Sequence, residues 1–347
     1  MVKMTGLKVN NIHKAFGEIQ ALAGISFEVA HGEVLAVLGP SGCGKSTLLS
    51  IIAGLEVPDE GQVSWDGRDL AGVPPHKRGF GLMFQDYALF PHKNVFENIA
   101  FGLQMNSLAK EQVTIQVKKA LELVGLPGFG KRDVNSISGG EQQRVALARS
   151  LAPQPKLMML DEPLGSLDRG LRERLLDDLR IILRDTGQTT LYVTHDQEEA
   201  FALADLVVVV DAGQVAQIGT PQEVYTHPKS VFVASFIGLT NIFPGQVVPS
   251  KTGKVVETPV GKISIFEQMS GPVHVLLRPD GAVLGGEGFQ LRGNVKSMAF
   301  RGGSTRATID VNGNELTFEF SSNIELPQVG ELITIGIDLE EAVQLFR

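Results

Sequence analysis

The chain has 347 residues, of which 43% are hydrophobic and 20% charged, a globular composition long enough for two domains. Its net charge of −8 and the lack of any basic run disfavour nucleic acid as a partner. One cysteine excludes an internal disulfide bond, and the lack of a signal peptide or a bilayer-spanning apolar run predicts a cytosolic chain that touches a membrane only through other subunits.

The first two thirds of the chain alternate between strand and helix patterns. Strands are expected within residues 7–38, ending in the wholly apolar run 34–38, and a further strand over 61–67 ends in an Asp-Gly turn. The expected helices cover residues 97–125, 140–151, 170–184 and 196–204. Apolar strands are expected between and after the last three helices, at residues 157–160, 190–193 and 206–210. This alternation predicts an α/β fold with a largely parallel sheet.

The pattern changes near residue 237. Short β-rich runs follow with no expected helix, and Asn312-Gly313-Asn314 is flanked by two alternating runs, the mark of a hairpin. We therefore predict two domains, residues 1–236 and residues 237–347, of which the second is an all-β barrel of the OB-like kind.

The segment GPSGCGKST, residues 39–47, follows the apolar strand and fits the pattern Gly-x-x-x-x-Gly-Lys-Ser. Glycines let backbone N–H groups curl around phosphate oxygens, and a helix beginning near Lys45 adds its positive end. Lys45 can reach the β- and γ-phosphates, and the Ser46 hydroxyl can ligate Mg²⁺. The expected nucleotide-binding residues are Ser41, Gly42, Cys43, Gly44, Lys45, Ser46 and Thr47.

Two carboxylates follow the apolar run at residues 157–160. Ligands bind at the carboxyl edge of open parallel sheets, where this strand ends. Asp161 is therefore expected to hold Mg²⁺, and Glu162 to direct the water that attacks the γ-phosphate. The alternative is a pair of solvated acids, which the phosphate loop disfavours.

Ser138, Gly139 and Gly140 open a third segment, at the start of an expected helix. Free N–H groups there are again suited to phosphate. Because Gly140 is unfavourable inside a helix start, its presence indicates a function.

Taken in order, the phosphate loop, a loop at Gln85, Ser-Gly-Gly, Leu-Asp-Glu-Pro and Thr-His-Asp resemble the motifs of the ATP-binding cassette (ABC) ATPases. The likeness is strongest to importer subunits with a C-terminal β-domain, and it covers residues 5 to about 236 densely. It implies a P-loop NTPase cassette with a helical subdomain at about 86–150, ATP and Mg²⁺ as cofactors, and ATP hydrolysis. It also implies a head-to-tail dimer, with a second copy or a homologous ABC ATPase.

The resemblance assigns further residues. Phe16 matches the aromatic residue that stacks on adenine, with a core residue at a strand end as the alternative. Gln85 matches the glutamine at the Mg²⁺ ion and the attacking water, and His195 the histidine at the γ-phosphate. The signature segment at Ser138 and a linking loop containing Asp168 match parts that face the other copy. The expected catalytic residues are Glu162, His195, Lys45 and Gln85, and the expected metal ligands are Ser46, Gln85 and Asp161.

The resemblance also implies partners and a location. Residues 87–92, from Tyr87 to His92, resemble the surface that receives a helix from the membrane subunit, and two membrane permease subunits are expected to dock near it. An external solute-binding protein would act indirectly, and the chain would lie at the cytoplasmic face of the membrane.

Three positions depart from the usual pattern. Glu141 replaces the commonest glutamine, and its charge indicates a side chain that does not point toward phosphate. Gly165 replaces alanine, and Leu206 stands where an arginine is frequent, with no evident consequence. The functional prediction is an importer ATPase for ferric iron, polyamine or thiamine, with an oxyanion or sugar importer as the alternative. A soluble, non-transport ABC ATPase is disfavoured by the lack of paired cassettes and basic arms. A purely regulatory module is disfavoured by the intact Glu162.

Overall fold

The computed structural model describes residues 5–105, 107–165, 169–250, 253–265, 269–286 and 288–347. The chain divides into two compact units between His227 and Pro228. The sequence predicted the boundary after residue 236, but the short helix α9 (Val231–Phe236) lies in the second unit. The helical pattern of α9 resembles that of the preceding α/β region. The chain just before α9 is nevertheless bound to the last strand of the second unit, because Gln344 donates to the carbonyl of Pro228 at 2.6 Å.

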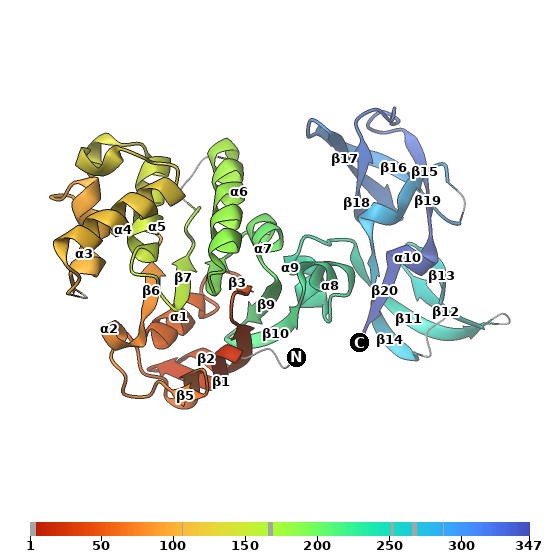
Figure 1. The fold of residues 1–347 in the computed structure, drawn as a ribbon. Helices are drawn as coiled ribbons and strands as arrows, with labels where there is room; N and C mark the ends of the chain where they lie inside the picture. The colour runs from red at the N-terminus through yellow and green to blue at the C-terminus, as the bar shows by residue number, and fades with distance from the viewer. Residues whose placement is uncertain (1–4, 106, 166–168, 251–252, 266–268, 287) are drawn as a thin grey trace. The chain divides into compact units, whose positions relative to one another are not determined.

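The first unit begins with an antiparallel sheet in the order β2-β1-β4-β5. Figure 1 labels three of its strands, β1, β2 and β5. Its strands are β1 (Thr5–Phe16), β2 (Ile19–Ala30), β4 (Glu60–Trp65) and β5 (Arg68–Asp69). Alternate side chains of β1 and β2 are fully buried in one core with α1 (Lys45–Ala53). This sheet therefore covers the helix that follows the phosphate loop.

The central sheet has the order β10-β9-β3-β8-β7-β6 in the described residues. Its strands are β3 (Val34–Leu38), β6 (Phe80–Met83), β7 (Leu157–Asp161), β8 (Thr190–Thr194), β9 (Leu206–Asp211) and β10 (Gln214–Gly219). All neighbours pair in parallel except β10 with β9, which confirms the predicted α/β class. The strands β3, β7, β8 and β9 are almost continuously buried, as expected where helices cover both faces.

Three helices of the first unit share one core with side chains of the central sheet: α3 (Val95–Met105), α4 (Lys110–Leu123) and α5 (Gly139–Leu151). The long helix α6 (Arg169–Thr186) contributes its apolar side to the same core, through Leu179, Ile182 and Leu183. The remaining short helices are α2 (Pro75–Arg78), α7 (Gln197–Leu203) and α8 (Pro221–Thr226). Among the described residues, no helix combines the length and apolar character needed to cross a bilayer.

The second unit contains two five-stranded antiparallel sheets. One consists of β13 (Gly261–Ile265), β12 (Gly253–Thr258), β11 (Ile242–Ser250), β14 (Gly271–Leu277) and β20 (Val343–Phe346). The other consists of β15 (Ala282–Leu284), β19 (Leu332–Ile337), β16 (Phe289–Phe300), β17 (Ser304–Val311) and β18 (Asn314–Ser321). The predicted hairpin is present between β17 and β18, where Asn312 and Gly313 take positive φ angles. The two sheets share one hydrophobic core.

Candidate functional site at the carboxyl edge of the central sheet

Four neighbouring parallel strands bring the predicted motifs to one edge of the central sheet. The phosphate loop follows β3, Asp161 ends β7, His195 follows β8, and Gln85 lies two residues after β6. Because these strands run in parallel, their carboxyl ends meet at the same edge. The sequence could place each motif after a strand, but the strand order that gathers them comes from the structure.

The phosphate loop requires glycine for specific reasons. Gly44 has a φ of +99°, and a Cβ on it would meet the carbonyl oxygen of Ala21. A Cβ on Gly39 would lie 2.5 Å from the carbonyl oxygen of Val210. Gly42 also has a positive φ, +83°, but faces open space. The loop is thus packed closely against neighbouring backbone at both ends, and α1 begins directly after it.

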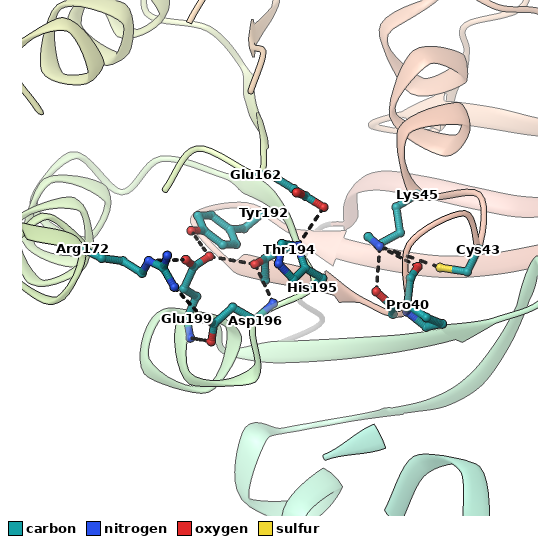
Figure 2. A network of polar contacts seen from close by, with 11 residues as sticks. Pro40, Cys43, Lys45, Glu162, Arg172, Tyr192, Thr194, His195, Asp196 and Glu199 are labelled. Atoms are coloured by element: carbon teal, nitrogen blue, oxygen red, sulfur yellow. Dashed lines mark hydrogen bonds and ion pairs between the residues drawn. The ribbon is translucent and has the colours of Figure 1, made fainter. Parts of the chain in front are cut away.

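Lys45 is only 6% exposed. Its ammonium group donates to the carbonyl of Gly39 at 2.7 Å and to that of Pro40 at 3.0 Å, and it lies 4.0 Å from Cys43 Sγ (Figure 2). Burial raises the pKa of the Cys43 thiol, although the charge of Lys45 opposes this. Lys45 therefore folds over its own loop, at the start of α1.

Ser46 and Asp161, two of the expected metal ligands, lie near each other, and the Ser46 hydroxyl acts on the pKa of the Asp161 carboxyl. Burial is the main cause that raises the pKa of Asp161, the neighbouring Glu162 adds to it, and the Ser46 hydroxyl opposes it. The described residues contain no group of three or more His, Cys, Asp or Glu that could hold a metal ion.

Glu162 and His195 are in contact at this edge. Glu162 Oε1 lies 3.1 Å from His195 Nδ1 (Figure 2). Glu162 holds a positive φ of 45°, and its N–H donates to the carbonyl of Val193 on β8 at 2.9 Å. Gln85 faces the same place, because its amide nitrogen and Glu162 Oε2 would both lie 3.8 Å from a Cβ on Gly165. An alanine would fit at Gly165, so this departure from the usual pattern leaves the space around Glu162 unchanged.

A polar network surrounds the turn that carries His195, and the sequence analysis missed it. Glu199 on α7 accepts hydrogen bonds from Tyr192 and Thr194 of β8, and Arg172 on α6 contacts both Glu199 and Asp196 (Figure 2). An acidic residue five positions after the last residue of a buried strand was a usable signal. The burial of Glu199, however, could not be predicted, because it follows Asp196 and Glu198 in a run of acids typical of an exposed helix face.

Ser138 caps α5 in a way that involves Glu141. Its hydroxyl donates to Glu141 Oε2 at 2.8 Å, its N–H reaches the same oxygen at 2.7 Å, and the Glu141 N–H returns to the Ser138 hydroxyl at 3.4 Å. A Cβ on Gly140 would lie 3.1 Å from Leu171 Cδ2. The second glycine therefore has a packing reason, which the sequence analysis did not consider when it assigned Gly140 to function alone. Gly139 is exposed and meets nothing that a Cβ would touch.

The segment from Tyr87 to His92 is held from two helices. Tyr87 and Ala88 both have positive φ angles, 60° and 43°, and Arg149 on α5 donates to both of their carbonyls at 2.6 Å. Asn98 on α3 is fully buried and binds both the N–H and the carbonyl of Phe90. Tyr87 is itself buried, whereas Ala88, Pro91 and His92 are exposed.

Phe16 ends β1 with 49% of its surface exposed. The ammonium group of Lys14 lies 5.3 Å from its ring centroid, and Asp59 binds the N–H of Ala15 at 2.7 Å. The chain is therefore held at Ala15, directly before Phe16, while the Phe16 ring remains open, which excludes the core alternative. The predicted nucleotide contact Asp168 lies outside the described residues.

Comparison with known proteins decides the family. Residues 22–165 match the family profile described as ABC transporter, and residues 275–345 match that described as TOBE domain. The chain is 47% identical over 332 residues to the Fe(3+) ions import ATP-binding protein FbpC of Streptomyces avermitilis, with 95% of each chain covered. The chain belongs to the ABC transporter family. This confirms the predicted ABC cassette with an OB-like β-domain and the predicted class of importer ATPase, an ATP-hydrolysing enzyme.

Other relatives of this ABC protein differ in the solute that they are named for. The spermidine/putrescine import ATP-binding protein PotA of Clostridium acetobutylicum is 41% identical over 334 residues, covering 96% of this chain and 94% of its own. PotA of Bacteroides fragilis is 40% identical over 335 residues, covering 96% and 73%. The solved structure of cbiO1 from Clostridium perfringens, described as part of the ABC transporter complex cbiONQ, has a TM-score of 0.60 at 30% identity. It covers 64% of this chain and 91% of its own.

Proposed function

We propose that this ABC chain hydrolyses ATP for a membrane importer, with Glu162 as the residue that activates water. The observation that carries the proposal is the 3.1 Å contact between Glu162 and His195. It lies at the same edge of the sheet as the phosphate loop and the Ser46–Asp161 pair. A carboxylate held here in a strained backbone conformation suits a positioned catalytic group.

The phosphate loop binds the triphosphate. Its backbone N–H groups and the positive end of α1 face the phosphates, as residues 41–47 were predicted to do. On this proposal Lys45 exchanges its carbonyl partners, Gly39 and Pro40, for the β- and γ-phosphate oxygens. Phe16, open on one face of β1, stacks on the adenine ring.

The donor set around Ser46 suits Mg²⁺. Magnesium is usually held by one or two protein oxygens together with substrate phosphates and water, so a dedicated cluster of carboxylates is not required. Ser46 and Asp161 offer a neighbouring hydroxyl and carboxylate, and Gln85, two residues after β6, offers an amide oxygen. The ion would offset the negative charge that develops on the phosphates.

Glu162 takes the proton of the attacking water, and His195 lies beside the γ-phosphate. Lys45 supports the charge that develops there. The nucleotide is enclosed by a second copy, or by a homologous ATPase, that presents Ser138, Gly139, Gly140 and Asp168 from across the interface. This assignment is supported by the exposure of Ser138 and Gly139 at the start of α5, where backbone N–H groups are suited to phosphate.

The segment from Tyr87 to His92 receives two membrane permease subunits, to which an external binding protein delivers the solute. Arg149 and Asn98 hold this segment from helices α5 and α3. The chain then lies at the cytoplasmic face of the membrane. Ferric iron is the favoured solute because the FbpC relative has the higher identity, 47% against 40–41% for the two PotA relatives, whose polyamines come second.

The test of this proposal is Glu162→Gln. The variant should bind ATP with the affinity of the wild type and lose hydrolysis by about a thousandfold, because the amide cannot take a proton. Glu122→Gln is the control, since it removes a carboxylate of the same type from the exposed face of α4. Hydrolysis at the wild-type rate in Glu162→Gln would remove Glu162 from this role.

A further inference from the structure

We propose that Glu199 is a positioning residue for ATP hydrolysis: through Thr194 it fixes the turn that carries His195, and thereby the contact between His195 and Glu162. The inference rests on the roles proposed above for Glu162 and His195. It adds to them a residue that touches neither the nucleotide nor the water.

The His195 side chain is 53% exposed. A side chain with so much free surface is not oriented by packing alone. Its orientation depends on the backbone on either side and on its contact with Glu162. Both neighbours of His195, Thr194 and Asp196, take part in the network around Glu199 (Figure 2).

The Thr194 hydroxyl makes two hydrogen bonds. It donates to Glu199 Oε2 at 2.7 Å and accepts the N–H of Asp196 at 3.0 Å. A hydroxyl has a single proton, so donation to Glu199 directs its lone pairs toward Asp196. The hydroxyl therefore links Thr194, the residue before His195, to Asp196, the residue after it. Glu199 orients the hydroxyl for this hydrogen bond.

Arg172 on α6 contacts two of the same residues. Its guanidinium lies 3.2 Å from Asp196 Oδ2 and 3.9 Å from Glu199 Oε1. The same turn is thus supported from a second helix by charge. Asp196 also accepts the N–H groups of Glu198 and Glu199, which begins α7 directly after the turn.

Burying the Glu199 carboxyl has a cost in free energy. Glu199 is 3% exposed, and burial is the main cause that raises its pKa. A buried carboxylate is unfavourable unless its partners compensate, and an apolar residue would fill the same space without that cost. The competing explanation is that Glu199 only satisfies the two hydroxyls of Tyr192 and Thr194, and so serves stability alone.

The two hydroxyls allow these explanations to be separated, because both donate to the same oxygen. Tyr192 Oη lies 2.9 Å from Glu199 Oε2, but only Thr194 also binds Asp196. Thr194→Val and Tyr192→Phe each remove one buried donor to Glu199. Thr194→Ser keeps the hydroxyl and serves as the conservative variant.

If Glu199 positions His195, Thr194→Val lowers kcat for ATP by about tenfold or more, with KM changed by less than about twofold. Tyr192→Phe and Thr194→Ser should stay within about twofold of the wild-type kcat. Equal losses of kcat in Thr194→Val and Tyr192→Phe, or no loss in either, would overturn the inference.

A second readout needs no hydrolysis. The ring resonances of His195 in isotope-labelled protein are assigned by their loss in His195→Gln. They should shift in Thr194→Val and stay in place in Tyr192→Phe, and unchanged resonances in both variants would contradict the inference. Failure of the proposed function is distinct, because it appears as full hydrolysis in Glu162→Gln.

Discussion

The Ser138 hydroxyl donates to the carboxylate of Glu141 across 2.8 Å, within its own helix. The sequence analysis expected only that Glu141 would not point toward phosphate. In the structure the carboxylate turns back onto Ser138 and completes a capping box. The hydroxyl that our proposal assigns to the ATP of the other copy therefore already has an anionic acceptor. On this proposal, Glu141 competes with phosphate for the same donor.

Glu141→Gln should relieve this competition. The amide oxygen still accepts from Ser138, but the negative charge near the incoming phosphate is removed. We expect the ATP concentration for half-maximal hydrolysis to fall by about two- to fivefold, as a screened charge at this distance allows. Steady-state assays against Glu122→Gln measure this, and a rise in that concentration would refute the competition.

The same substitution, Glu141→Gln, should lower the stability of the fold, and the size of this loss should depend on pH. The N–H of Ser138 and then its hydroxyl lower the pKa of Glu141 below its ordinary value. A carboxyl whose pKa is lower in the folded state stabilises the fold above the unfolded value, and this contribution is lost as pH falls through the folded value. Urea unfolding should therefore find the wild type slightly more stable than Glu141→Gln at pH 6–7, with the difference closing below about pH 4. A difference that grows on acidification would contradict this explanation.

Cys43 gives a direct probe of the phosphate loop because it is the only cysteine in the chain. Its thiol is buried and its pKa is raised, so little thiolate is available. At pH 8, alkylation should be about tenfold slower or more in the folded protein than in the urea-unfolded chain. ATP with Mg²⁺ should slow it further. Alkylation that is indifferent to ATP would place the nucleotide elsewhere.

Arg149→Lys should separate hydrolysis from coupling to the membrane subunits. The guanidinium holds the carbonyls of two residues in a strained conformation, and an ammonium cannot serve both in the same geometry. We expect the isolated subunit to hydrolyse ATP within about twofold of the wild type, while stimulation by the membrane subunits is lost. Arg184→Lys, on the exposed face of α6, is the control. Normal stimulation in Arg149→Lys would show that Tyr87 and Ala88 do not control docking.

The sequence indicated which side chains follow the strands, but not the contacts that support them. Strand ends, glycines and acids are local signals, so Lys45, Asp161 and Glu162 could be placed at a phosphate site from their spacing. The supporting contacts are long-range: Glu199 is buried by the packing of α7, and Arg149 reaches a segment some sixty residues earlier in the chain, at Tyr87. Strand β6 was not predicted as a strand because Phe80–Met83 is short and follows no clear alternation. The domain boundary differed because α9 continues the helical pattern of the first unit.

The central claim is that ATP is enclosed only between two copies, and sedimentation velocity on Glu162→Gln tests it most directly. With ATP and Mg²⁺ the variant should sediment as a dimer, and without nucleotide, or with ATP and a further Ser138→Arg substitution, as a monomer. A variant that binds ATP fully and stays monomeric at every protein concentration would contradict the account.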